Sequence, residues 1–72
     1  MGLYDDTLNV LKNYMGPAAQ KFLDRQIERL AIPKDNIGPH IGDLAGACKT
    51  SAALLLDDAK AAEIEQKIRT LA

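Results

Sequence analysis

Apolar side chains recur every three or four residues along almost the whole chain, and each of its three prolines stands where that pattern is interrupted. This spacing is the period of an α-helix that buries one face. Proline is tolerated in the first turn of a helix but ends or redirects a helix elsewhere. The sequence therefore predicts short amphipathic helices separated by tight corners.

The first two predicted helices meet at a glycine-proline corner. The first helix is predicted from the helical spacing of Tyr4, Leu8, Leu11 and Met15. It ends at Gly16-Pro17, because glycine tolerates a left-handed C-cap and proline opens the next helix. The second helix runs from Pro17 to about Ala31, and Ile32-Pro33 stops it because a residue before proline avoids the α region.

The third predicted helix begins near Gly38-Pro39, with Asp35 or Asn36 as the candidate cap in the loop before it. It either continues to Leu56 or breaks near Thr50-Ser51, and periodicity leaves both alternatives open. Its apolar stripe extends to Leu55. A fourth helix then starts at Asp57 or Asp58, either of which is a suitable N-cap residue.

The fold class expected from this pattern is all-α, with residues 1–72 forming one domain. About four short helices should pack as a compact bundle or an orthogonal array. The chain has only 72 residues and three aromatic side chains, so its core must be small and aliphatic. Ile27, Leu44 and Ile64 are predicted to be buried, and Cys48 is predicted to act as a small core hydrophobe.

Three glycines at four-residue spacing are the sharpest feature of the third helix: Gly38, Gly42 and Gly46. Each weakens a helix by roughly 1 kcal/mol relative to alanine, so a compensating contact is expected. Small residues on one face allow another backbone to approach closely. The contact is either internal helix packing or a docking groove for a partner helix or a second copy.

Basic side chains form a second pattern, because Lys21, Arg25 and Arg29 recur at helical spacing on the predicted second helix. They could meet an acidic partner or phosphates. Asp24 and Glu28 lie among them and are expected to dilute their field. The formal net charge is −1, and neither half of the chain is strongly basic, so nucleic acid is an unlikely partner.

Catalytic and metal sites have little support in the sequence. His40 and Asp43 are the only candidates for acid–base chemistry, and a single cysteine and a single histidine cannot supply a four-ligand zinc site. We therefore expect no enzyme activity, no metal and no cofactor. No apolar run approaches the roughly 20 residues that span a bilayer, and Asp5 and Asp6 stand where a signal peptide is basic, so a cytoplasmic protein with no membrane partner is expected.

The segment Leu11-Lys12-Asn13-Tyr14-Met15-Gly16-Pro17-Ala18-Ala19-Gln20-Lys21-Phe22-Leu23 resembles the short helical tail modules at the ends of some bacterial serine/threonine kinases and related signalling proteins. Those modules have an apolar helix end, a Gly-Pro corner and an apolar second helix. The resemblance covers about a fifth of the chain and implies a non-catalytic helical regulatory or interaction module.

The leading functional hypothesis is a small helical protein–protein interaction or regulatory module, which could also associate with itself as a homodimer. Its candidate binding residues are Gly38, Gly42, Gly46, Lys21, Arg25 and Arg29. The alternative is a helical nucleic-acid-binding protein that uses the Lys21/Arg25/Arg29 stripe.

Overall fold

Helices and turns account for most of the chain in the computed structural model, which describes residues 2–71. Helix α1 spans Leu3–Met15, α2 spans Ala19–Leu30, α3 spans Ile41–Leu55 and α4 spans Asp58–Arg69. Two short 3-10 turns, Gly16–Ala18 and Gly38–His40, precede α2 and α3. No strand occurs in residues 2–71, so the prediction of an all-α fold is confirmed.

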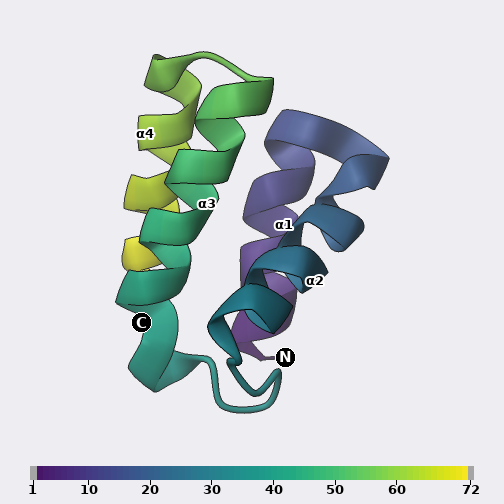
Figure 1. Ribbon diagram of the computed structural model, residues 1–72, viewed down its shortest axis with the longest axis vertical. Helices are drawn as coiled ribbons and strands as arrows, with labels where there is room; N and C mark the ends of the chain where they lie inside the picture. Colours follow the sequence, from purple (N-terminus) through teal and green to yellow (C-terminus); the bar gives the residue numbers. More distant parts are fainter. Residues whose placement is uncertain (1, 72) are drawn as a thin grey trace.

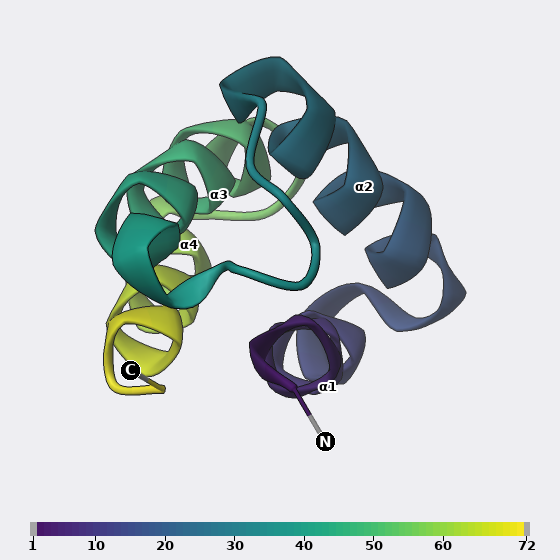
Figure 2. The ribbon, with the colours of Figure 1, turned by 90° about the horizontal axis from the view of Figure 1, so that it is seen from below.

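The helices are arranged as a closed ring around the core. Helices α3 and α4 lie side by side and antiparallel, and α1 and α2 lie beside them (Figure 1). Each helix contacts the next one along the chain, and α1 also contacts α4 (Figure 2). The line along which α2 packs against α3 lies on the face seen in Figure 1, and we call it the α2–α3 junction.

The core is aliphatic, as the low aromatic content requires. Ile27, Leu44 and Ile64 are buried, which confirms the predicted core positions. Cys48 is also fully buried, and burial raises the pKa of its thiol to about 12 because the thiolate would lose its hydration. The cysteine therefore behaves as a small core hydrophobe, as expected.

The predicted corners form for local reasons. Gly16 adopts a φ of +58° and donates its N–H to the carbonyl of Lys12, and Pro17 follows in the first positions of a 3-10 turn. At the end of α2, Ala31 adopts a left-handed conformation and the N–H of Ile32 bonds to the carbonyl of Ile27 over 3.0 Å. The bond from Ile32 is part of a Schellman motif at the end of α2, which brings Ile32 into the core.

The third helix begins later than predicted, whereas its C-terminal end agrees with the alternative of a helix that continues without a break. Gly38-Pro39 lies in a 3-10 turn, so α3 begins only at Ile41, and it continues without a break to Leu55. The candidate caps Asp35 and Asn36 are wrong, because the chain enters this turn through Ile37 with no side-chain cap. At the other end, Asp57 caps α4 by accepting the N–H of Lys60 over 2.7 Å.

The prediction that Leu55 belongs to the buried stripe of the third helix is also wrong. Leu55 is 68% exposed, whereas Leu56 packs against the core. The helix ends at Leu55, and the extended backbone of Leu56 turns the chain toward α4. The inward position that periodicity assigns to Leu55 is therefore taken by the next residue.

Two tyrosines of α1 form hydrogen bonds to the neighbouring helices α2 and α4. The hydroxyl of Tyr4 donates a hydrogen bond to Asp24 on α2, and the hydroxyl of Tyr14 donates one to Glu63 on α4 over 2.9 Å. The ammonium groups of Lys34 and Lys67 lie over the rings of Tyr4 and Tyr14 at 5.2 and 5.0 Å. These contacts supplement the aliphatic core at both ends of α1.

Candidate protein-binding cleft

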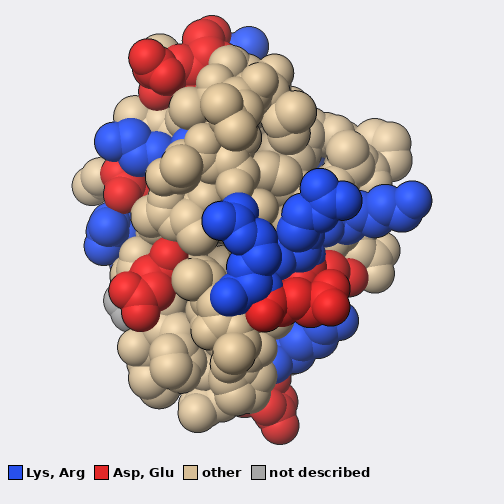
Figure 3. All heavy atoms as spheres, in the orientation of Figure 1, with Lys and Arg blue, Asp and Glu red and all other residues tan. Residues whose placement is uncertain are grey.

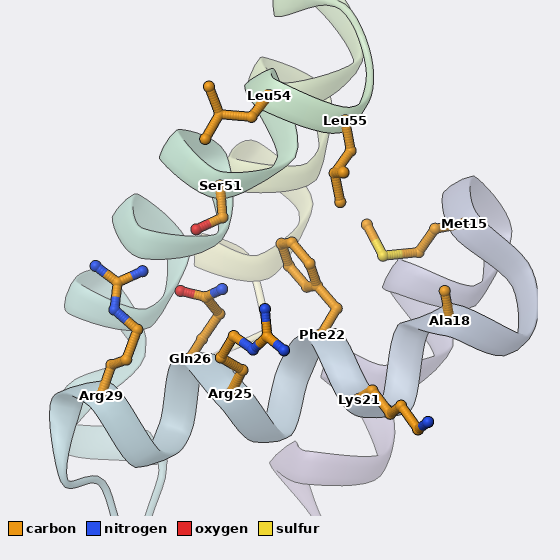
Figure 4. A pocket seen from close by; sticks show the side chains of 10 residues that line it. All are labelled: Met15, Ala18, Lys21, Phe22, Arg25, Gln26, Arg29, Ser51, Leu54 and Leu55. Atoms are coloured by element: carbon orange, nitrogen blue, oxygen red, sulfur yellow. The ribbon is translucent and has the colours of Figure 1, made fainter.

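An open cleft of about 410 Å³ follows the junction between α2 and the C-terminal half of α3 (Figure 4). Both helices contribute side chains to it, and the end of α1 closes it at one side. The lining residues are Met15, Ala18, Lys21, Phe22, Arg25, Gln26, Arg29, Ser51, Leu54 and Leu55.

Large apolar side chains at one end of the cleft remain open to solvent. Leu54 is 86% exposed and Leu55 is 68% exposed, and Met15 and Phe22 lie opposite them at half-buried positions (Figure 4). Leu54 and Leu55 are consecutive residues at the end of α3 and point off the buried face of the helix, and Leu56, beyond the helix end, takes the place against the core. An exposed leucine pair beside a partly buried aromatic is typical of a binding surface.

Basic side chains form the other wall. Lys21, Arg25 and Arg29 are four residues apart on α2, so they share one face of the helix, and all three line the cleft. Figure 3 shows Lys and Arg atoms gathered across this face of the molecule. No carboxylate lines the cleft, and none of the three cations forms an ion pair within residues 2–71.

Asp24 is bonded to α1 and does not line the cleft. Its carboxylate accepts the 2.6 Å hydrogen bond from Tyr4 and lies 3.4 Å from Lys34 Nζ. Glu28, the other acidic residue among the three cations, is exposed and also lies outside the lining. Figure 3 shows acidic atoms beside the basic ones on this face, so the expectation that Asp24 and Glu28 dilute the field of the stripe stays a prediction.

Gln26 is a lining residue that the sequence analysis missed. It is only 2% exposed, and its side-chain amide points toward Ser51 between the two helices (Figure 4). The buried Oε1 atom accepts no hydrogen bond within the described part of the chain. An unpaired buried amide oxygen costs about 1–3 kcal/mol, which offsets part of what burial of this side chain contributes. The signal available in the sequence was its place one residue before Ile27, within the buried arc of the helix.

The three glycines do not form one groove. Gly38 lies against Leu3, whose Cδ1 would be 3.4 Å from an added Cβ, whereas an added Cβ at Gly46 would meet nothing within 4 Å. At Gly42 an added Cβ would come 3.4 Å from Nη1 of Arg69, which is the far end of a flexible side chain. Internal close packing of helices at Gly42 and Gly46, one of the two alternatives, is therefore wrong.

Gly42 and Gly46 instead face a second hollow of about 480 Å³. This hollow also contains Arg29 and Ser51, so it continues the cleft along the same α2–α3 junction. The structure thus brings two of the predicted glycines together with Arg29 of the basic stripe, in a hollow that Asp43 also lines. It places Gly38 elsewhere.

His40 and Asp43 make no hydrogen bond or ion pair with each other in the described residues. Histidine, cysteine and acidic side chains of residues 2–71 nowhere gather in a group of three that could hold a metal ion. Within the same residues, no helix has the length and apolar character needed to cross a membrane.

Comparison with known proteins adds no relative, since no family model, curated protein or solved structure matches this chain. The cleft therefore has to be interpreted from its own chemistry.

Proposed function

We propose that this protein is a small helical interaction module that binds an acidic, amphipathic segment of a protein in the cleft between α2 and α3. The observation that supports the proposal is the pairing of exposed leucines with three cations that have no ion-pair partner among the described residues. Apolar side chains of the segment would cover Leu54, Leu55 and Phe22. Its carboxylates would face the basic stripe.

The energetics favour such a ligand over a purely polar one. Covering a leucine side chain contributes about 1.5–3 kcal/mol, so Leu54 and Leu55 supply the largest available gain in binding free energy. The cations of Lys21, Arg25 and Arg29 would chiefly set the specificity and the association rate. A nucleic acid would use the cations but would leave the two leucines uncovered, and the cleft offers only Phe22 for base stacking.

The regulatory part of the proposal rests on the resemblance of residues 11–23 to the helical tail modules of bacterial signalling kinases. The Gly16-Pro17 corner within that segment places Met15 and Ala18 at the edge of the cleft. A module of this kind would act by holding a partner protein rather than by chemistry of its own.

The test is an NMR titration of the labelled protein with a synthetic amphipathic helix of about 15 residues, leucine on one face and glutamate on the other. We expect shift changes confined to the cleft, with Leu54→Ser and the double variant Lys21→Glu/Arg25→Glu each weakening binding at least tenfold. Lys12→Glu, an exposed charge reversal outside the cleft, is the matched control and should bind like wild type.

Two further ligands complete the test. The same peptide with lysine in place of glutamate should bind poorly, because it meets the basic stripe with like charge. Duplex DNA should bind weakly and lose that binding steeply as salt rises. Tighter binding of DNA than of the acidic peptide, or shift changes away from the cleft, would overturn the proposal in favour of the nucleic-acid alternative or of another surface.

A further inference from the structure

The chain itself contains a segment with the chemistry that the cleft requires. The two exposed leucines, Leu54 and Leu55, are followed after Leu56 by Asp57 and Asp58 at the turn between α3 and α4. Both aspartates are exposed, and neither forms an ion pair within residues 2–71. An apolar pair with carboxylates beside it is therefore presented at one end of the molecule.

The order of these features on the surface suits a two-fold axis. The α3–α4 turn is at the top of the molecule in Figure 1, and Figure 3, in the same orientation, shows acidic atoms there with basic atoms beside them, and a larger group of basic atoms, with acidic atoms below it, across the middle. In Figure 4 the leucines lie on the side of the cleft opposite the basic side chains of α2. The apolar pair therefore lies between the acidic turn and the basic stripe.

We propose that a second copy of this chain occupies the cleft, as a symmetric dimer with its two-fold axis near Leu54 and Leu55. The inference rests on the proposed function and names its partner. Rotation by half a turn about that axis places the leucines of the two copies together. It also brings the acidic turn of each copy, Asp57 and Asp58, over the basic stripe of the other.

Symmetry strengthens the match, because a two-fold interface uses one self-complementary patch and makes every contact twice. The patch here contains both members of each required pair: apolar with apolar, and carboxylate with cation. A standard interface covers about 800 Å² of each partner, which is close to a fifth of the 4366 Å² surface of this small chain. Dimer formation would also cover leucines that the monomer leaves exposed.

Charge reversal at the two ends of the proposed contact tests this symmetry directly. Arg25→Glu places like charges in both contacts of its own dimer, and so does Asp58→Lys. A mixture of the two variants has opposite charges in both contacts. Asp58 is chosen over Asp57 because Asp57 caps α4, and its loss would disturb the fold.

We expect sedimentation equilibrium to show a monomer–dimer equilibrium for the full chain, with each single variant raising the dimer Kd at least tenfold and the mixture restoring it to near the wild-type value. Leu54→Ser, at a side chain that is 86% exposed, should keep the melting temperature at concentrations where the wild type is monomeric, and should raise the Kd. Lys12→Glu should leave the Kd unchanged. A wild-type chain that stays monomeric up to about 1 mM, or a mixture that associates no better than its components, would overturn the dimer.

The acidic peptide separates this inference from the proposed function. The Asp58→Lys variant retains an intact cleft but does not dimerise, so it should bind the peptide like wild type at concentrations where wild type is monomeric. A monomeric wild type that still binds the peptide would overturn the dimer alone. Failure of monomeric Asp58→Lys to bind the peptide, together with charge-dependent wild-type dimers, would overturn the proposed function and leave the dimer in place.

Discussion

The hydroxyl of Tyr4 donates a hydrogen bond to Oδ1 of Asp24 over 2.6 Å, across 20 residues of sequence. This bond joins α1 to α2, and the carboxylate that accepts it is not among the groups that line the cleft. The Asp24 charge is shared further with Lys34, whose Nζ is 3.4 Å away. One contact between two helices therefore contributes to the packing of α1 and also engages an acidic side chain that is adjacent in sequence to Arg25.

Tyr4→Phe tests that contact, because it removes the hydroxyl and keeps the ring under Lys34. We expect the free energy of unfolding in urea to fall by about 1 kcal/mol, the usual net value of such a hydrogen bond. Asp24→Asn, which keeps an acceptor at the same place, should lose less than this. A Tyr4→Phe protein as stable as wild type would show that the bond is absent in solution.

The same bond predicts a pH dependence. The hydrogen bond to Asp24, with burial and the nearby carboxylates, raises the pKa of Tyr4 from 10.0 to about 12. The folded state therefore holds the phenolic proton more tightly than the unfolded state. Its contribution to stability is fully present below pH 10.0 and is lost as the pH rises toward about 12. An ultraviolet titration should show this late phenolate in wild type and not in Tyr4→Phe.

Local features of the fold were largely predictable from sequence. The corner at Gly16-Pro17 follows from the conformational properties of two residues, and Leu44 and Ile64 follow from helical periodicity. The sequence could not show that Leu56, rather than Leu55, packs against the core, because periodicity assumes that the helix continues.

Features that depend on contacts between helices were not predictable. The four-residue spacing of Gly42 and Gly46 shows that they share a helix face, but it cannot show that this face is open. The stripe on α2 was visible in the sequence, yet its apolar counterpart at Leu54 lies on another helix. The sequence therefore indicates the basic wall of the cleft, and only the contacts between helices show which apolar wall faces it.

Ala31 provides a prediction on stability alone. It is the one non-glycine residue of the described chain with a positive φ, at +55°, and it is exposed. A left-handed conformation costs an L-residue about 1–2 kcal/mol, which exceeds the extra entropy that glycine loses on folding. Ala31→Gly should therefore raise the free energy of unfolding by about 0.5–1 kcal/mol in urea denaturation. The matched control is Ala62→Gly in the interior of α4, which should lower it by about 1 kcal/mol.

Gly46→Ala addresses the open glycine face. An added Cβ meets no atom within 4 Å, so only the gain in helix propensity remains. We expect the free energy of unfolding to rise by about 1 kcal/mol. Gly42→Ala should gain less, because its Cβ would lie 3.4 Å from Arg69 Nη1. A loss of thermal stability in Gly46→Ala would instead place a close helix contact at this position.

Cys48 tests the interior of α3 by chemistry. Its thiol is fully buried, and its pKa is raised to about 12, so very little of the reactive thiolate exists at neutral pH. Alkylation of the native protein should be slow and should become fast in denaturant. Labelling that is as fast in the native state as in the unfolded state would show that α3 is rotated relative to the structure.

Gln26→Met joins the stability of the fold to the chemistry of the cleft. Methionine has similar length and no polar end, so it removes the buried amide oxygen that finds no hydrogen-bond donor within residues 2–71. We expect the free energy of unfolding to rise by about 1–2 kcal/mol, because the cost of desolvating that oxygen disappears. Gln20→Met, at an exposed position on the same helix, should change it by less than about 0.5 kcal/mol.

If the amide serves the acidic peptide as a hydrogen-bonding group, Gln26→Met will be more stable and will bind the peptide more weakly in the NMR titration. Unchanged peptide affinity would assign Gln26 to the wall of the cleft alone, and reduced stability would show that the amide already has a partner in the folded protein.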